Sequence, residues 1–262
     1  MAECNDGASG SASERNSRYL LIVDSDADEL YYTAMLLQRF EYNICTARNA
    51  DEAIEMVSVA LPTLIISELS LTGRNGLELL KQLKENPRSA LVPMVIKALD
   101  PSPEVERKCL EAGAALIKRP VQAEDIYRIV QSTIENTPRE NIRIHTRLPV
   151  MVNSKPLDCS GEGECATVLS QHGMYVRTLK PASVGSKLSL QIVVKDRTIA
   201  LEARVLYSHR FGEGPFKEPG MGLKFISIAP KDQDFIQQFI REEVTKGIKP
   251  AGHQDLSSTK TI

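Results

Sequence analysis

Short apolar runs alternate with helically periodic segments through the first half of the chain, and this alternation constrains the fold most strongly. The run Tyr19-Leu-Leu-Ile-Val-Asp24 ends in a carboxylate, and its continuous apolar character is typical of a parallel strand buried on both faces. Five such strand–helix units fill about 120 residues, with strands predicted at 19–24, 43–47, 64–67, 92–96 and 116–117. The pattern predicts an α/β doubly wound domain with a parallel five-stranded sheet, and a site at the carboxyl ends of its strands.

The pattern changes to a period of two after Pro138. Short β-branched runs, separated by Gly, Pro, Ser and Asp, predict strands at 148–152, 166–169, 174–178, 187–194, 198–207 and 222–227. The segment 231–244 has the apolar spacing of an amphipathic helix. This half therefore predicts a small antiparallel β-barrel with a C-terminal helix.

Charge also divides the chain of 262 residues, whose overall formal charge is only −2. Residues 18–137 carry 13 basic and 18 acidic side chains, whereas residues 138–247 carry 16 and 12. We therefore expect two domains with different partners, at 18–136 and 137–247, between a disordered leader at 1–17 and a disordered tail at 248–262.

Several protein classes are disfavoured by simple features of the sequence. No apolar run approaches the ~18–20 residues of a membrane span, and the N-terminus lacks the apolar region of a secretory signal. The five cysteines contain no CxxC pair and the four histidines are scattered, so we expect reduced thiols, no metal site and no cofactor. The charge balance and the absence of Trp argue against nucleic acid as a partner. A cytoplasmic protein without membrane insertion is expected.

The first half resembles a known signalling family in the order of its motifs. Asp24 ends the first strand, Ile66-Ser67-Glu68 ends the third, and Gly76-Leu-Glu-Leu-Leu80 opens a helix; Ala112-Gly-Ala114 and Arg119-Pro120 follow. In this order the motifs resemble a response-regulator receiver domain. The resemblance implies an acidic pair for Mg²⁺, a phosphoacceptor Asp, a Thr or Ser after strand four and a Lys before Pro.

The residues at those positions depart from the receiver pattern. Asp24 is kept, but Ser25 follows it, and Glu68 occupies the phosphoacceptor position. Lys97 stands at the Thr or Ser position, and Arg119 at the Lys position. We expect a non-phosphorylatable pseudo-receiver in which Lys97 and Arg119 neutralise Glu68. The alternatives are a drifted site on a docking scaffold, and a response regulator that is phosphorylated on Glu68.

The second half resembles a PilZ domain, the barrel that senses cyclic di-GMP in bacteria. Four elements carry the resemblance, in this order: Arg143-Ile-His-Thr-Arg147, Ser170-Gln-His-Gly173, Glu202-Ala-Arg-Val205 and Gly220-Met-Gly-Leu-Lys-Phe225. The first is an RxxxR element, and the second matches the SxxG half of the family motif [D/N]xSxxG.

The resemblance implies cyclic di-GMP binding by Arg143, Arg147, Ser170 and Gly173. Arginine suits this ligand because its planar donor fork bonds bidentately to phosphate or to the O6 and N7 acceptors of guanine. We expect the two arginines to lie on an exposed arm before the first strand and to fold over the ligand. Val168 replaces the expected Asp or Asn, a loss that costs on the order of 1–3 kcal/mol.

Two functions follow from these observations. The first is a non-enzymatic bacterial signalling protein, a cyclic di-GMP effector with a degenerate receiver. The alternative is a nucleotide-independent adaptor that binds protein partners through both modules. By resemblance the output concerns motility, pilus function, polarity or surface attachment. Intact Arg143 and Arg147 favour the effector, whereas Val168, Glu68 and Lys97 favour the adaptor.

Overall fold

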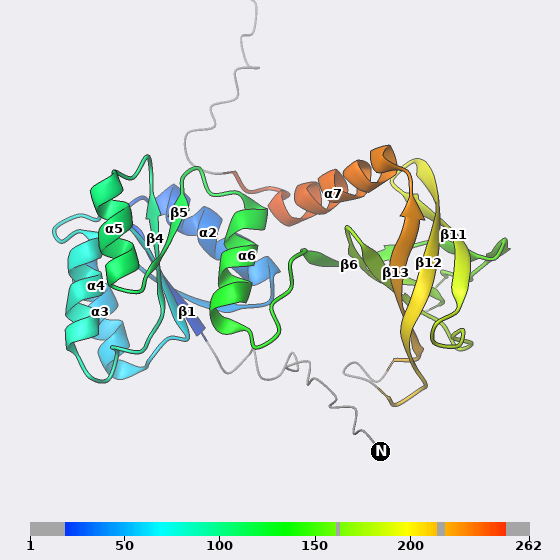
Figure 1. Cartoon of the computed structure of the whole chain (residues 1–262), viewed down its shortest axis with the longest axis horizontal. Helices are drawn as coiled ribbons and strands as arrows, with labels where there is room; N and C mark the ends of the chain where they lie inside the picture. The colour runs from blue at the N-terminus through cyan, green and yellow to red at the C-terminus, as the bar shows by residue number, and fades with distance from the viewer. Residues whose placement is uncertain (1–18, 161–162, 214–217, 250–262) are drawn as a thin grey trace, which may run out of the picture. The chain divides into compact units, whose positions relative to one another are not determined.

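The computed structural model describes residues 19–160, 163–213 and 218–249 (Figure 1). Within these residues the chain forms two compact units, one of residues up to 140 together with those from 245 onward, and one of residues 141–244. The predicted leader, 1–17, lies outside the described residues, as does the predicted tail beyond residue 249.

The first unit is a parallel five-stranded sheet between two layers of helices. The strand order is β2-β1-β3-β4-β5, which confirms the predicted doubly wound fold. Figure 1 shows α3, α4 and α5 on one face and α2 and α6 on the other. The elements are β1 (Tyr19–Val23), α2 (Ala27–Arg39), β2 (Asn43–Ala47), α3 (Ala50–Val59), β3 (Leu64–Glu68), α4 (Gly76–Glu85), β4 (Met94–Ala98), α5 (Pro103–Glu111), β5 (Ala115–Lys118) and α6 (Ala123–Ile134).

Local sequence explains where these elements lie. Every residue of β3 and of β4 is buried, as expected for central strands covered by helices on both faces. Helix α2 begins after Asp26, whose carboxylate accepts hydrogen bonds from the backbone N–H groups of Asp28 and Glu29. Asn75 and Glu78 form a reciprocal capping box at the start of α4. These caps fix the loops that follow β1 and β3, where polar side chains gather.

The second unit is an eight-stranded sheet of order β6-β9-β10-β13-β12-β11-β7-β8. Only Pro149 separates β6, at one edge, from β7, beside the other edge, so the sheet curls to bring its ends together. This confirms the predicted barrel-like fold. The strands are β6 (Arg143–Leu148), β7 (Val150–Val152), β8 (Lys155–Pro156), β9 (Cys165–Ser170), β10 (Gly173–Arg177), β11 (Lys187–Val194), β12 (Arg197–His209) and β13 (Gly220–Ile228).

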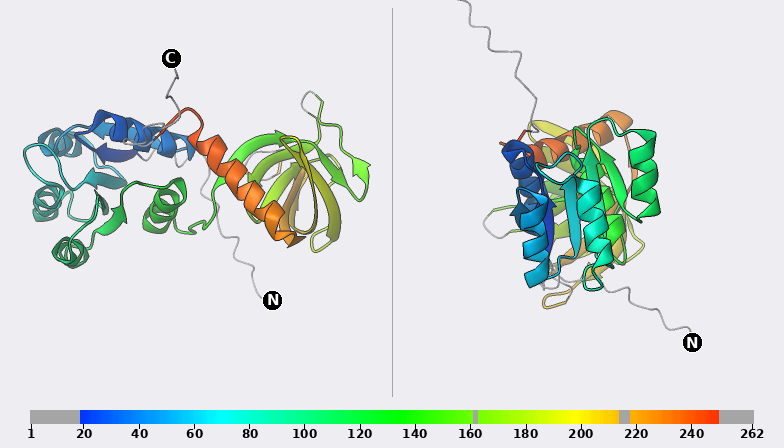
Figure 2. Two further views of the ribbon diagram at one scale, coloured as in Figure 1. Left: turned by 90° about the horizontal axis from the view of Figure 1, so that it is seen from above. Right: turned by 90° about the vertical axis from the view of Figure 1, so that its left-hand side faces the viewer.

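Helix α7 (Pro230–Thr245) completes the second unit, with bounds close to those predicted. Its buried stripe consists of Ile236, Phe239, Ile240 and Val244. The left view of Figure 2 shows α7 lying across the curled strands. No helix in the described part of the chain is long and apolar enough to cross a membrane.

Candidate functional sites

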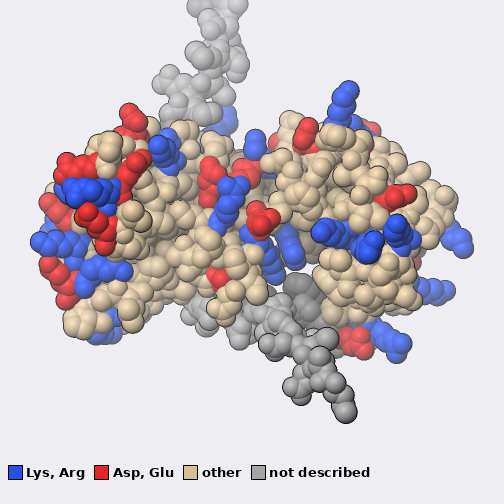
Figure 3. Space-filling model, in the orientation of Figure 1, with Lys and Arg blue, Asp and Glu red and all other residues tan. Residues whose placement is uncertain are grey.

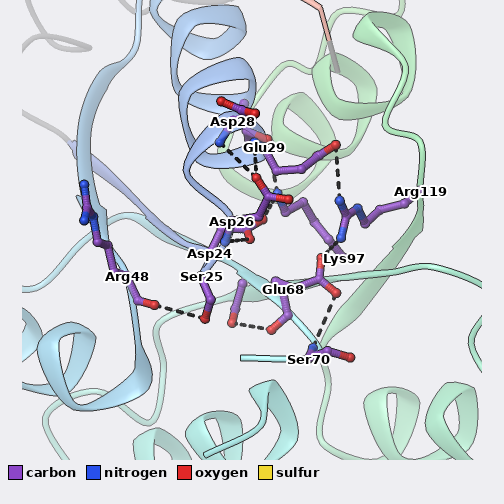
Figure 4. Close-up of polar contacts among 12 residues, drawn as sticks. Asp24, Ser25, Asp26, Asp28, Glu29, Arg48, Glu68, Ser70, Lys97 and Arg119 are labelled. Carbon is purple, nitrogen blue, oxygen red and sulfur yellow. Dashed lines mark hydrogen bonds and ion pairs between the residues drawn. The ribbon is translucent and has the colours of Figure 1, made fainter. Parts of the chain in front are cut away.

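Four predicted residues of the first unit meet at the carboxyl edge of its sheet (Figure 4). Asp24 directly follows β1, and Arg119 directly follows β5. Glu68 ends β3 and lies beside Lys97 of β4 in the strand register. Strand β4 extends further than predicted, so Lys97 lies within the strand and not after it.

Lys97 forms a fully buried ion pair with Asp24. Its ammonium lies 2.7 Å from the Asp24 carboxylate, and the two side chains are 0% and 1% exposed. The ammonium also donates a hydrogen bond of 3.2 Å to the hydroxyl of Thr33. The expected ion pair between Lys97 and Glu68 is therefore wrong. Asp24 is the more deeply buried carboxylate, and a charge so far from water requires a direct counter-ion.

Arg119 holds two other carboxylates at once. Its guanidinium lies 3.1 Å from Glu68, as expected, and 3.2 Å from Glu29. Glu29 belongs to the first turn of α2 and is 1% exposed. Glu29 was not predicted from the sequence, although helical spacing places it on the face of α2 that carries Leu36, seven residues later.

Burial and the paired charges together set the pKa values of this pocket. Desolvation raises the pKa of Glu68 above its usual value, although the Arg119 charge and a hydrogen bond from the Ser70 N–H act in the opposite direction. Burial alone lowers the pKa of Arg119, but Glu68 and Glu29 outweigh that effect and raise it overall. The guanidinium therefore stays charged and remains the counter-ion of both glutamates.

Magnesium does not fit the residues present in this pocket. Mg²⁺ requires several oxygen ligands in near-octahedral geometry. The Asp24 carboxylate is engaged by Lys97, and Asp26 caps α2. The Ser25 hydroxyl donates to the Arg48 carbonyl and accepts from the Thr72 N–H. Among the described residues, no group of three or more His, Cys, Asp or Glu could hold a metal ion.

The second unit brings three of its four predicted ligand residues onto adjacent strands. Arg143 of β6 lies opposite Ser170 of β9, which lies opposite Gly173 of β10. The Ser170 hydroxyl donates a 3.0 Å hydrogen bond to the Gly173 carbonyl. A Cβ atom at Gly173 would lie 2.4 Å from the Leu223 carbonyl oxygen, so the close approach of β10 to β13 requires glycine.

The two arginines lie on a strand and not on an arm before it, which corrects the expectation. Residues Arg143–Leu148 form β6, because Ile144 and Leu148 are buried in the core while both arginines remain exposed. The Arg147 guanidinium donates a 3.1 Å hydrogen bond to the Cys159 carbonyl. It is therefore tethered to the neighbouring loop.

Two tyrosines flank the predicted site and were missed by the sequence analysis. Val168 lies opposite Tyr175, which in turn lies opposite Gly222. The rings of Tyr175 and Tyr207 stack with centroids 6.3 Å apart. A Cβ atom at Gly222 would lie 2.2 Å from the Tyr207 ring, so the glycine makes room for it. The Gly220-x-Gly222 spacing was the sequence feature that could have indicated two large side chains packed over this strand.

Known families match both units. Residues 20–131 match the response regulator receiver domain, and residues 137–242 match the PilZ domain. The chain therefore belongs to the response regulator receiver family through its first unit, and a PilZ domain follows it.

Individual relatives match mainly the first unit. The two-component response regulator ORR12 of Oryza sativa subsp. japonica is 30% identical over 117 residues, which are 44% of this chain and 97% of the relative. The sensory/regulatory protein RpfC of Xanthomonas campestris pv. campestris is 27% identical over 152 residues, which are 55% of this chain and 21% of the relative. Among solved structures, chemotaxis protein CheY4 of Vibrio cholerae is 22% identical, with a TM-score of 0.43 over 44% of this chain and 98% of that one.

Proposed function

We propose that the protein is a non-enzymatic signalling protein whose PilZ domain binds cyclic di-GMP and whose receiver domain is not phosphorylated. The observation that carries the first part is the line formed by Arg143, Ser170 and Gly173 on three adjacent strands. An exposed arginine beside a hydroxyl and a bare backbone position suits a ligand that presents phosphates and guanine edges.

The charge arrangement of the receiver pocket supports the second part of the proposal. Phosphoryl transfer requires a metal ion that neutralises charge and an acceptor free to attack. Here the Lys97 ammonium neutralises Asp24, and the Arg119 guanidinium is bonded to Glu68. The side chains of the pocket thus pair with one another and leave no place for the metal ion.

Calorimetric titration of the full chain with cyclic di-GMP tests the ligand. We expect wild type to bind and Arg147→Ala to bind about tenfold to a hundredfold more weakly, because a hydrogen bond to a charged group is lost. Val168→Asp should bind more tightly than wild type by a similar factor. No heat from wild type at ligand concentrations far above micromolar would contradict the proposal.

The same titration separates the effector from the adaptor. Val168 is the observation that favours the adaptor, because an apolar side chain there bonds no donor on guanine. If Val168→Asp binds the ligand and wild type does not, the protein is a nucleotide-independent adaptor.

Incubation with acetyl phosphate and Mg²⁺, followed by intact-mass spectrometry, tests the receiver. We expect no phosphorylated wild-type species. The positive control combines Ser25→Asp, Glu68→Asp, Lys97→Thr and Arg119→Lys, which restore the residue types of the receiver pattern, and it should accept phosphate. A phosphorylated wild-type species that disappears in Glu68→Gln would show that the receiver is active.

A further inference from the structure

One line of paired residues crosses six strands of the second unit. Directly paired residues of antiparallel strands carry their side chains on the same face of the sheet. The line therefore places Arg143, Ser170 and Gly173, three of the four predicted ligand residues, on one face with three further cations. Its successive pairs are Arg143 with Ser170, Ser170 with Gly173, Gly173 with Lys224, Lys224 with Arg204, and Arg204 with Lys187.

Lys224 is the first of these cations beyond the predicted ligand residues. It is exposed, and its side chain forms no ion pair or hydrogen bond with any residue that the structure describes. Its neighbour on one side is Gly173, which has no side chain, and on the other side is Arg204, which has the same charge. Like charges directly opposite each other destabilise a sheet, so folding alone does not account for Lys224. Figure 3 shows Lys and Arg side chains gathered on the visible face of this unit.

We propose that Lys224 is a further residue of the cyclic di-GMP site, where its ammonium binds a phosphate or the O6 and N7 edge of a guanine. This inference rests on the proposed function of the second unit. The Cα atoms of directly paired residues lie about 5 Å apart, so a ligand lying over Gly173 is within reach of the long Lys224 side chain. An ammonium donates three hydrogen bonds and attracts phosphate, and these contacts offset part of what is lost at Val168.

Lys187 provides a matched control within the same line. It is also an exposed lysine without an ion pair to any described residue, and it lies two strands beyond Lys224. Gly173 and Lys187 are three strand spacings apart, about 14 Å, which is longer than the Debye length of about 8 Å at physiological salt. A ligand over Gly173 therefore feels the Lys187 charge only weakly, although the two lysines contribute equally to the net charge.

Calorimetric titration of the full chain with cyclic di-GMP, at constant salt, tests this inference. We expect Lys224→Met to weaken binding by about tenfold or more, because a charged hydrogen bond is lost, and Lys224→Arg to retain most of the affinity. Lys187→Met should change the affinity by no more than about twofold. Thermal unfolding of all three variants should occur at or slightly above the wild-type temperature, because both lysines are exposed and each methionine variant removes a like charge opposite Arg204.

The outcomes distinguish this inference from the proposed function. Equal losses in Lys224→Met and Lys187→Met would show a diffuse charge effect, and unchanged affinity in Lys224→Met would show no contact; either result overturns the inference while the ligand site stands. Absence of binding by wild type would overturn the proposed function, and Lys224 would have no role with it.

Discussion

The buried pair of Lys97 and Asp24 is the closest of the ion pairs described in the receiver pocket. Both side chains are withdrawn from water, and the 2.7 Å contact is supplemented by the Thr33 hydroxyl. The attraction within such a pair is offset largely by the cost of removing both charges from water. Each residue therefore supports the stability of the fold mainly by neutralising the buried charge of the other.

A double-mutant cycle measures this dependence. We expect Lys97→Met and Asp24→Asn each to lower the free energy of unfolding by about 3–5 kcal/mol, because each leaves one buried charge without its counter-ion. The double variant should lose much less than the sum, because no buried charge then remains unpaired. Urea unfolding measures all four proteins. If the losses in free energy of unfolding of the two single variants add up to that of the double variant, the two side chains do not interact.

At the scale of elements, the periodicity of the sequence predicted the order and type of the main strands and helices. The apolar run at 64–67 became β3, and the segment at 231–244 became α7 with one more residue at each end. These elements are predictable because one local pattern, repeated along the segment, determines which faces become buried. Strand β6 was missed because only Ile144 and Leu148 of its six residues are buried apolar side chains.

Contacts between elements were less predictable than the elements themselves. The order of the predicted strands showed that Lys97 and Asp24 lie at the same edge of the sheet. It did not show whether the Lys97 ammonium reaches the carboxylate of Asp24 or that of Glu68. That choice depends on relative burial, which arises only when α2 covers the strand ends. The stacking of Tyr175 and Tyr207 likewise depends on β13 lying between β10 and β12.

At the scale of the whole molecule, each unit contains a phenol withdrawn from water, buried in the case of Tyr32 and half-buried in the case of Tyr175, whose ionisation opposes folding. Burial, with the Glu29 and Glu124 charges, raises the pKa of Tyr32 to about 12. Burial, with Tyr207 and Glu218, raises the pKa of Tyr175 to about 12. Between pH 10 and pH 12 the unfolded chain loses these protons while the folded chain retains them. Stability present below pH 10 is therefore lost as the pH rises toward 12.

Alkaline titration of the phenolate absorbance tests this prediction. We expect at least two of the seven tyrosines, Tyr32 and Tyr175, to ionise near pH 12 in the folded protein, and all seven near pH 10 in denaturant. Tyr32→Phe and Tyr175→Phe should each remove one late step, and each variant should lose less stability than wild type over this range. Complete ionisation near pH 10 in the folded protein would contradict the assignment.

The Lys97–Asp24 pair also restricts how the sequence can change by single substitutions. Replacing Lys97 by the threonine of an active receiver leaves Asp24 buried without a cation, and replacing Asp24 first leaves a buried ammonium. A single substitution at either position thus leaves one buried charge unpaired, whereas a change at both positions leaves none. We therefore expect the two positions to be substituted together in evolution, and not one at a time.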